Sequence, residues 1–317
     1  MPASERASIS QFRLQGQPAV RLENGLIKAE VLPQLGGRIW NLWHEPSNTQ
    51  WLWHRPGKRL RASEPGATHD NAWPGGWEQI FPNHDPGLFQ GRNLPDHGEW
   101  WSRGWEWEIQ EKSEHRAVLH LWHDGAATPT RCQKWITLEP GSSELKVRYR
   151  IQHMGSGKFF FMLKENLALA VDPDHRLELP GGQMTPVDLK FSSRIGRAGS
   201  YVWPVAEDKS RRPVDLSVLP PKSEKLREYI YLYDMPDGWC GVRNAKNGHY
   251  LRLRYPRVIF PYACIFMSLG GWKNLYTVAL QPCTNMPHDL SAAVQAGRCA
   301  GLDSFGVLEV EVSVELG

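Results

Sequence analysis

Apolar and polar residues alternate along most of this chain with a period of two. The clearest runs are VLHLWHD (118–124), KWITLEP (134–140), ELKVRYRIQH (144–153) and VLEVEVSVEL (307–316). Side chains of a β-strand point alternately to its two faces, so this period is typical of strands with one face buried and one face in solvent. The pattern predicts a protein built mainly of half-buried antiparallel strands.

Residues 19–43 show the same alternation, interrupted by a turn at Asn24-Gly25. A continuously apolar run at 159–171 predicts a strand buried on both faces, yet Lys164, Glu165 and Asn166 interrupt it. Three polar residues in a buried strand need partners. We therefore expect them to face a cavity or to mark a bulge.

Helix signals are rare. We expect one helix, within residues 288–301, beginning at Asp289 or Ser291 and ending at Gly297 or Gly301. Residues 204–228 are rich in proline and charge, and they predict a long surface excursion between strands. The fold class is therefore all-β: a large twisted antiparallel β-sandwich formed as a single domain over residues 1–317, with extra strands over one end.

Residues 71–108 depart from this pattern. They hold six of the fifteen tryptophans, among many Pro, Gly, Asn and Asp residues. Long structured loops are often binding surfaces. An indole ring offers a flat apolar face and one donor, which suits the C–H faces and hydroxyl rim of a sugar. The alternative is that these tryptophans bury a sheet face.

Composition excludes several other functions. The net charge of +3 is spread over interspersed acids and bases, so no basic face suggests nucleic acid. No apolar run approaches membrane-spanning length, and the polar N-terminus suggests no signal peptide. The five cysteines are scattered and never form a CxxC pair, which favours a reducing, cytoplasmic setting over a disulfide framework. No triplet of histidines or acids has the spacing of a metal site, and no cofactor is expected.

Four segments, in order, resemble the aldose 1-epimerase or galactose mutarotase-like superfamily. They are VLPQLGGRIWNLW, GGWEQIFP followed by LPDHGEWWSRGW, then FFFMLKENLALAVDPDHRLELP, and YTVALQPCTNMPHDLSAAV. The nearest resemblance is to a bacterial epimerase-like branch with a DHGEWWSRGW segment. It implies a large β-sandwich with a sugar cleft across its concave sheet, and an enzyme that interconverts the α and β anomers of a sugar.

Anomer exchange needs a base for the proton on O1 and an acid for the ring oxygen, roles that suit a carboxylate and an imidazole. The resemblance places His97 on the family histidine that contacts the sugar. It places Asn166 on the family's acid histidine and Gln281 on its base glutamate. Amides hold hydroxyl groups but do not exchange protons near pH 7. The substitutions therefore predict weak or absent standard mutarotase activity.

Other residues complete the expected site. We expect a sugar of monosaccharide size to contact five residues of the family-like segments, Arg38, Trp77, Glu78, Trp101 and Arg103, and one residue at the end of a predicted strand, Asp234. A nearby acid, Glu165, Glu78 or Glu99, is a candidate for a relocated base. Glu165 would need a bulge, because neighbouring strand residues face opposite ways.

Three functions follow from this interpretation. The first is a carbohydrate-binding protein without standard catalysis. The second is an active aldose 1-epimerase or another sugar isomerase that uses relocated acid and base residues around His97. The third is a protein-interaction sandwich whose tryptophan segment is covered by a partner chain. The oligomeric state and the identity of the sugar, including whether it is phosphorylated, stay open.

Overall fold

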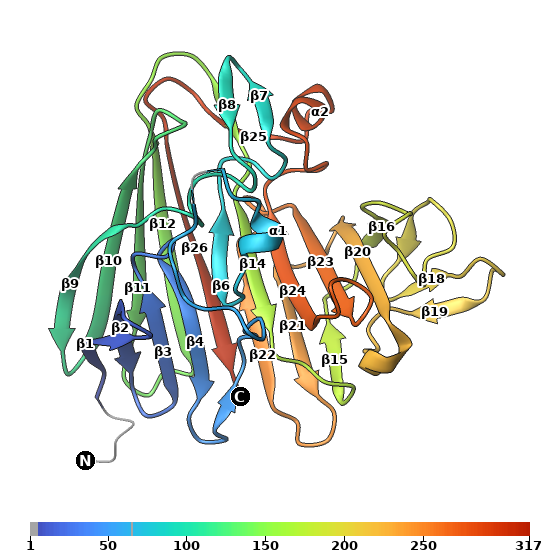
Figure 1. The fold of residues 1–317 in the computed structure, drawn as a ribbon, viewed down its shortest axis with the longest axis horizontal. Helices are drawn as coiled ribbons and strands as arrows, with labels where there is room; N and C mark the ends of the chain where they lie inside the picture. The colour runs from blue at the N-terminus through green and yellow to red at the C-terminus, as the bar shows by residue number, and fades with distance from the viewer. Residues whose placement is uncertain (1–5, 65) are drawn as a thin grey trace.

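Two large antiparallel sheets pack face to face in this protein (Figure 1). The architecture is that of a computed structural model, which describes residues 6–64 and 66–317. Within those residues the sheets have twelve and eight strands, and every pairing between named strands is antiparallel. The predicted all-β sandwich is confirmed. Among the described residues, no helix has the length and apolar character needed to cross a membrane.

The twelve-stranded sheet carries the front face in Figure 1. Its strands, in spatial order, are β1 (Ser8–Leu14), β2 (Gln17–Glu23), β3 (Ile27–Leu32), β4 (Arg38–His44), β6 (Trp77–Ile80), β14 (Lys164–Leu169), β24 (Tyr276–Cys283), β23 (Tyr262–Leu269), β20 (Leu226–Tyr233), β16 (Gln183–Pro186) and β17 (Tyr201–Val202), with β5 (Thr49–Gln50) paired to β4.

The eight-stranded sheet lies behind it. Its strands, in spatial order, are β15 (His175–Glu178), β21 (Trp239–Asn244), β22 (Tyr250–Arg254), β26 (Val307–Leu316), β12 (Glu144–His153), β11 (Thr130–Leu138), β10 (Arg116–Asp124) and β9 (Glu106–Ser113). Three two-stranded ribbons join β7 (Gly87–Phe89) to β8 (Arg92–Leu94), β13 (Phe159–Phe161) to β25 (Ala300–Leu302), and β18 (Val205–Glu207) to β19 (Pro213–Asp215). The helices are α1 (His69–Ala72), α2 (Leu290–Gln295) and the short 3₁₀ turn η2 (Lys222–Glu224).

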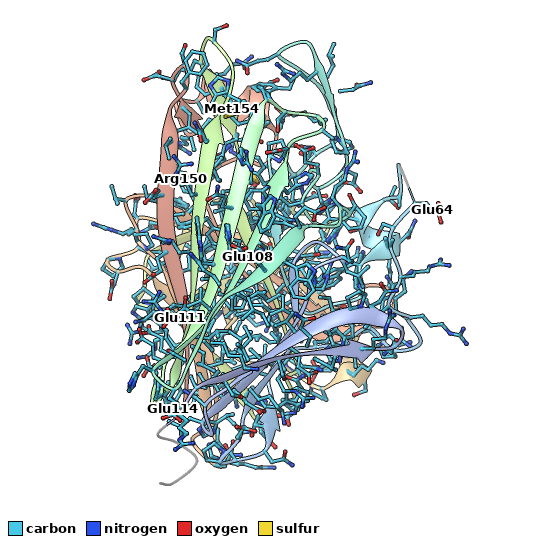
Figure 2. All side chains as sticks on the ribbon, turned by 90° about the vertical axis from the view of Figure 1, so that its left-hand side faces the viewer. Glu64, Glu108, Glu111, Glu114, Arg150 and Met154 are labelled. Atoms are coloured by element: carbon cyan, nitrogen blue, oxygen red, sulfur yellow. The ribbon has the colours of Figure 1, made fainter. Side chains whose placement is uncertain are left out.

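The hydrophobic core fills the space between the sheets, as the alternation predicts. Leu119 and Ile136 of the eight-stranded sheet and Leu167 and Leu280 of the twelve-stranded sheet belong to one buried cluster. In the side view of Figure 2, side chains occupy the whole interior, and charged residues such as Glu108 lie on the outer side. The burial of apolar area between two layers is the main stabilising contribution to such a fold.

A polar cluster inside this core links the two sheets. Glu165 of β14 accepts hydrogen bonds from Trp77 Nε1 (2.6 Å), Gln79 Nε2 (2.9 Å) and Tyr149 Oη (3.3 Å). Lys134 of β11 donates to Gln79 Oε1 at 2.6 Å. Burial raises the pKa of Glu165 and lowers the pKa of Lys134 to about 7. Buried polar groups with partners of this kind fix the relative position of the layers.

Several local predictions are confirmed and others need correction. The turn at Asn24-Gly25 separates β2 from β3, and the Asp289 carboxylate caps α2 by accepting from Ala292 N at 2.7 Å. The helix expected within 288–301 ends before Gly297, the first of its two expected stops, and Ala300–Leu302 pairs with β13. The segment 71–108, in contrast, is more ordered than a loop, since it contains the last two residues of α1, the strand β6 and the hairpin β7–β8.

Three of the six tryptophans in residues 71–108 lie in the main hydrophobic core. Trp77, Trp100 and Trp105 are at most 1% exposed and belong to the main hydrophobic cluster. Successive side chains of a strand point to opposite faces, so Trp77 points to the core and its neighbour Glu78 points to the outer face of β6. The alternative interpretation, that these rings bury a sheet face, therefore holds for three of the six.

The loop that carries His97 is held against β6 by a close backbone contact. His97 and Gly98 both have positive φ, at 57° and 72°, and Glu99 N donates to Phe81 O at 2.8 Å. A Cβ atom at position 98 would collide with the Phe81 carbonyl. Gly91, with φ of 75°, has open space at the same position.

We predict that Gly98→Ala destabilises the protein by about 1–3 kcal/mol more than Gly91→Ala, because only the first adds a collision to the same backbone strain. Urea unfolding of both variants measures the difference. Equal losses would mean that the approach of Gly98 to Phe81 is not a tight constraint.

Candidate functional site

A row of polar side chains crosses the outer face of the twelve-stranded sheet at its centre. The row runs over the neighbouring strands β4, β6, β14, β24, β23 and β20. Its members are Arg38 of β4, Glu78 of β6, Asn166 of β14, Gln281 of β24 and, across β23, Tyr229 of β20. Glu78 and Asn166 are directly opposed in the β6–β14 register, which brings their side chains to the same face.

The hydrogen bonds along this row all run in one direction. Lys164 Nζ donates to Tyr229 Oη at 3.2 Å, and Tyr229 Oη donates to Gln281 Oε1 at 2.9 Å. Gln281 Nε2 donates to Asn166 Oδ1 at 2.9 Å, and Asn166 Nδ2 donates to Glu78 Oε1 at 2.9 Å. A carboxylate only accepts hydrogen bonds, so Glu78 determines which end of each amide faces its neighbour.

Glu78 is fully buried, and its charge is balanced within the row. Its carboxylate forms an ion pair with Arg38 and accepts from His69 Nε2 at 2.6 Å. Burial alone would raise the pKa of Glu78, but the charges of Arg38 and His69 and the hydrogen bonds from His69 and Asn166 lower the pKa to about 2. Glu78 is therefore a fixed negative charge rather than a proton acceptor near pH 7.

A cavity of about 450 Å³ opens above this row, a volume within the range of small-molecule sites. Asn166 and Gln281 lie on its floor. Its walls are largely aromatic and histidine side chains from α1 and from the strands and loops around it, with a few polar groups at the rim: His69, Trp73, His84, His97, Phe191, Tyr229, Phe266, Trp272, Asp70, Asp96 and Lys273.

Four histidines form a column beside the cavity, and three of them, His69, His84 and His97, line it. The ring centroids are 4.1 Å apart between His69 and His97, between His97 and His84, and between His84 and His288. Close packing against one another and against the buried wall disfavours the charged form. Burial, followed by neighbouring positive charges, lowers the pKa of His84 and of His288 well below the usual value.

His97 is oriented by its neighbour Asp96. The Asp96 carboxylate bonds His97 Nδ1 at 2.7 Å and also accepts from the backbone N of His69 at 2.7 Å. Burial and the nearby His69 lower the pKa of His97 to about 4, although Asp96 opposes the change. His97 is therefore neutral at pH 7. With Nδ1 held by Asp96, its Nε2 is the nitrogen left for a ligand.

His69, Asp70 and His97 also lie close enough for their ligand atoms to be within 4.8 Å of one another. Histidine binds a metal through a lone pair in the plane of its ring. The rings of His69 and His97 are stacked with an interplanar angle of 9°. Parallel stacked rings direct their lone pairs side by side rather than to one point, so this arrangement does not fit a metal centre.

The structure brings together only part of the predicted site. His97, Asn166 and Gln281 line the cavity, and Arg38 and Glu78 lie directly behind the floor. Trp77 lies in the core. Trp101 packs edge-on against His69 at 5.1 Å and reaches a neighbouring cavity.

The other predicted residues lie outside the cavity. Arg103 is exposed in the loop before β9, and Asp234 is exposed just after β20. Among the alternative acids, Glu165 faces the core, because β14 pairs with β6 in an unbroken register with no bulge. Glu99 anchors a loop by accepting from Ala126 N, Ala127 N and Thr128 Oγ1 at 2.7–2.9 Å.

Sequence reasoning missed most of the cavity wall. The sequence pattern does not identify His69, His84, Tyr229, Trp73 or Trp272 as members of the wall, nor His288 as the ring that stacks on His84. One signal was present: His84 lies with His97 in the tryptophan-rich segment 71–108, His69 lies just before that segment, and His288 lies in the last family-like segment. Their convergence depends on how β6 and β24 place those loops.

Known structures share this architecture. A candidate aldose 1-epimerase of Klebsiella pneumoniae superposes with a TM-score of 0.75 at 10% identity, over 98% of this chain and 84% of that one. A galactose mutarotase-like protein of Clostridium acetobutylicum superposes with a TM-score of 0.71 at 14% identity, over 98% of this chain and 99% of that one. One of Lactobacillus casei superposes with a TM-score of 0.65 at 16% identity, over 94% of this chain and 100% of that one. The chain therefore has the galactose mutarotase-like fold.

Sequence comparison adds no assignment. No protein-family model matches the chain, and no curated protein matches it. The residue-level chemistry of the site must therefore be argued from its own geometry.

The buried ion pair of Glu78 with Arg38 leads to a prediction about the free energy of unfolding. At pH 7, Glu78→Gln should lower the free energy of unfolding by about 3–5 kcal/mol, because Arg38 is left without its buried partner. The folded pKa of about 2 lies below the ordinary 4.5, so this contribution is complete above pH 4.5 and is lost as the pH falls toward 2. Denaturant unfolding at pH 7, 4 and 3 should show the two proteins converging.

The exposed Glu106, at the start of β9, supplies the control. Glu106→Gln should change stability by no more than about 0.5 kcal/mol at any of these pH values. A deficit in Glu78→Gln that stays constant down to pH 3 would contradict the ion-pair assignment.

Proposed function

We propose that this protein binds a sugar, of monosaccharide size, in the cavity above Asn166 and Gln281. The observation that carries the proposal is the one-way hydrogen-bond row that runs through these two amides to Glu78. The hydrogen bonds of this row use one N–H hydrogen and one oxygen lone pair of each amide side chain. Each amide keeps a second hydrogen and a second lone pair for a ligand.

Such a floor matches hydroxyl groups, which both donate and accept. Each amide offers a donor beside an acceptor, and the row on either side prevents the amide from flipping. The two residues are only 2% and 6% exposed, so a hydroxyl group that binds there leaves water behind. Fixed polar groups that need no reorganisation favour specific binding.

The walls supply the apolar part of sugar recognition. Trp73 and Phe266 pack edge to face at 6.4 Å, and Phe266 meets Trp272 at 5.3 Å, so the three rings form one aromatic wall. All three line the cavity. An aromatic face on one side and an amide floor below suit the C–H face and the hydroxyl rim of a pyranose.

The same geometry argues against standard mutarotase chemistry at positions 166 and 281. General acid–base catalysis contributes roughly 10²–10⁴-fold for a positioned group. An amide supplies none of it. The one carboxylate in contact with the floor, Glu78, is held ionised by Arg38 and is turned away behind Asn166. Binding without efficient anomer exchange follows from this arrangement.

A second candidate function rests on the contact between Asp96 and His97. A neutral imidazole whose Nδ1 is held by a carboxylate has the geometry of an oriented general base. His97 also borders His84 and His69, which line the same cavity. In this alternative the protein exchanges anomers through imidazoles, and His97→Gln would remove the exchange while Asn166 and Gln281 still bind the sugar.

Sugar titration followed by tryptophan fluorescence tests the first proposal, since Trp73 and Trp272 line the cavity. We expect a monosaccharide from a neutral panel to change the emission in a saturable way. His97→Ala should weaken that binding by about 1–3 kcal/mol, the cost of one lost buried hydrogen-bonding partner.

His115→Ala, in the exposed turn before β10, is the matched control and should bind like the wild-type protein. Unchanged affinity in His97→Ala would remove His97 from the site. The absence of binding by any sugar would reject the proposal.

The double change Asn166→His with Gln281→Glu should raise the rate of anomer exchange. It supplies an imidazole and a carboxylate at the floor, with Glu78 and Tyr229 positioned to orient them. NMR exchange spectroscopy on the bound sugar measures the rate, and each single change serves as a control. No increase in a double variant that still binds sugar would show that positions 166 and 281 are not where protons move.

A further inference from the structure

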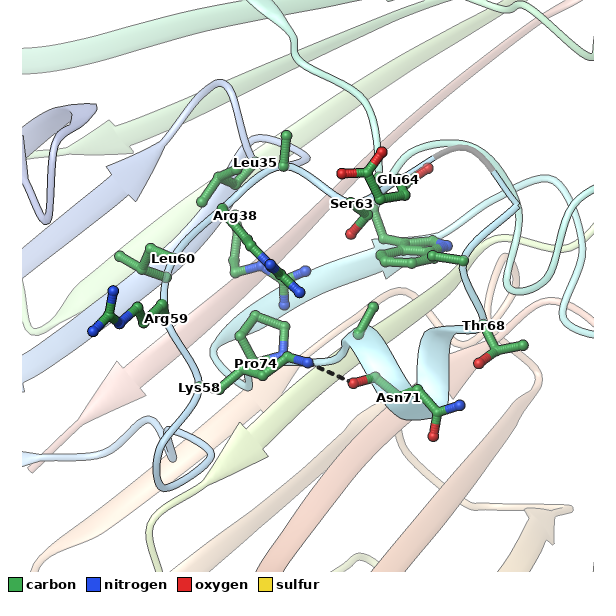
Figure 3. Close-up of a pocket in the computed structure, with 16 residues that line it drawn as sticks. Leu35, Arg38, Lys58, Arg59, Leu60, Ser63, Glu64, Thr68, Asn71 and Pro74 are labelled. Carbon is green, nitrogen blue, oxygen red and sulfur yellow. Dashed lines mark hydrogen bonds between the residues drawn. The ribbon is translucent and has the colours of Figure 1, made fainter.

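A second cavity lies beside the first, on the other side of α1 (Figure 3). Its volume is about 330 Å³. The loop that follows β5 and leads into α1 forms one wall, and the residues before β4 and β9 form the other. Thr68 and Asn71 line both cavities, so α1 separates two compartments whose rims adjoin.

The second cavity is rich in positive charge. Lys58, Arg59 and Arg61 line it, and Arg38 reaches into it from β4 (Figure 3). The Arg38 charge is already matched by Glu78. Its Nε is nevertheless buried without a hydrogen-bond partner. Glu64 is the one acid among the described lining residues, and it lies at the rim opposite Lys58 and Arg59.

These cations have no carboxylate partner among residues 6–64 and 66–317. No ion pair there includes any of the five basic residues around α1, namely Arg55, Lys58, Arg59, Arg61 and Lys273. Elsewhere on the described surface, many arginines and lysines do pair with acids, as Arg243 does with Glu178 at 2.7 Å. Other described cations, such as Arg92, Lys190 and Arg257, also lack ion pairs, and what distinguishes the five is that they lie together around one short helix.

Three of the five converge on the backbone of α1 instead. Arg55 Nη1 and Lys273 Nζ donate to Asp70 O at 2.9 and 2.8 Å, and Lys58 Nζ donates to Asn71 O at 2.7 Å. Carbonyl dipoles compensate a full charge only in part. The pKa of Lys58 is lowered by burial and then by the charges of Arg55, Arg61 and Lys273, which shows how closely the like charges lie.

Lys273 lies between the two groups of residues: its side chain lines the first cavity, and its Nζ donates to the Asp70 carbonyl of α1. An anion near α1 would relieve the repulsion among the cations and would lie next to the sugar cavity. Guanidinium groups and ammonium groups together are the usual donors to phosphate and carboxylate oxygens.

We propose that the second cavity is an oxyanion site that receives a phosphate or carboxylate group carried by the sugar bound in the first cavity. Lys58, Arg59 and Arg61 bind the anion, and Lys273 attracts it from the sugar side. The preferred ligand is then an acidic or phosphorylated sugar rather than a neutral one. This inference rests on the proposed function, and it adds the charge of the ligand.

Calorimetric titration at low salt tests it with matched probes: glucose and galactose, their uronic acids, their 6-phosphate esters, and inorganic phosphate alone. At least one anionic sugar should bind about ten-fold more tightly than its neutral parent. Raising the salt concentration should reduce this preference, because partly exposed charges are screened. Inorganic phosphate should compete with the anionic sugar and leave the binding of a neutral sugar unchanged.

Arg61→Gln and Lys58→Met should each reduce the preference for the anionic sugar several-fold without changing the affinity for the neutral one. Lys112→Met, on β9 of the other sheet, is the control and should bind as the wild-type protein does. Equal affinities for neutral and anionic sugars would overturn this inference and leave the proposed function standing. If inorganic phosphate binds but no sugar binds, both the inference and the proposed function are rejected.

Discussion

The buried ion pair between Arg38 and Glu78 is the interaction on which the candidate site depends. It holds a fixed negative charge at one end of the polar row, and that charge dictates the direction of every hydrogen bond along it. Without an acceptor-only group at position 78, both amides could flip, and the floor of the cavity would have no defined pattern of donors and acceptors. Glu78 also accepts from His69, so the same carboxylate positions the first ring of the histidine column.

Strand β14 divides two polar systems with different physical roles. Glu165 points into the core, where Trp77, Gln79 and Tyr149 stabilise it and help to link the two sheets. Asn166, the next residue, points to the opposite face and into the cavity. The sheet thus separates a structural network from a binding network by the thickness of one strand. A carboxylate one residue away from the site is for this reason unable to act in it.

The cavity combines a rigid polar floor with a wall of neutral imidazoles. Stacking and burial keep His97 and His84 uncharged near pH 7, while unpaired lysines and arginines gather on the far side of α1. The unpaired cations that line the second cavity, Lys58, Arg59 and Arg61, lie next to the place that an anionic group of the same ligand would reach. The two cavities are separated by α1, a helix of four residues whose side chains line both of them.

The sequence by itself determined the β-sandwich, the turn at Asn24-Gly25, a helix that begins at Asp289 or Ser291, and the opposite orientations of Glu165 and Asn166. Each of these depends on spacing along the chain, where side-chain direction follows from local backbone geometry. It did not determine the placement of the histidines or of Tyr229, nor that Trp77 would lie in the core. Those positions depend on which strands become neighbours and on which face each strand buries. Only the tertiary structure, through the register of β6, β14 and β24, brings residues as far apart in the chain as Glu78 and Gln281 into one polar row.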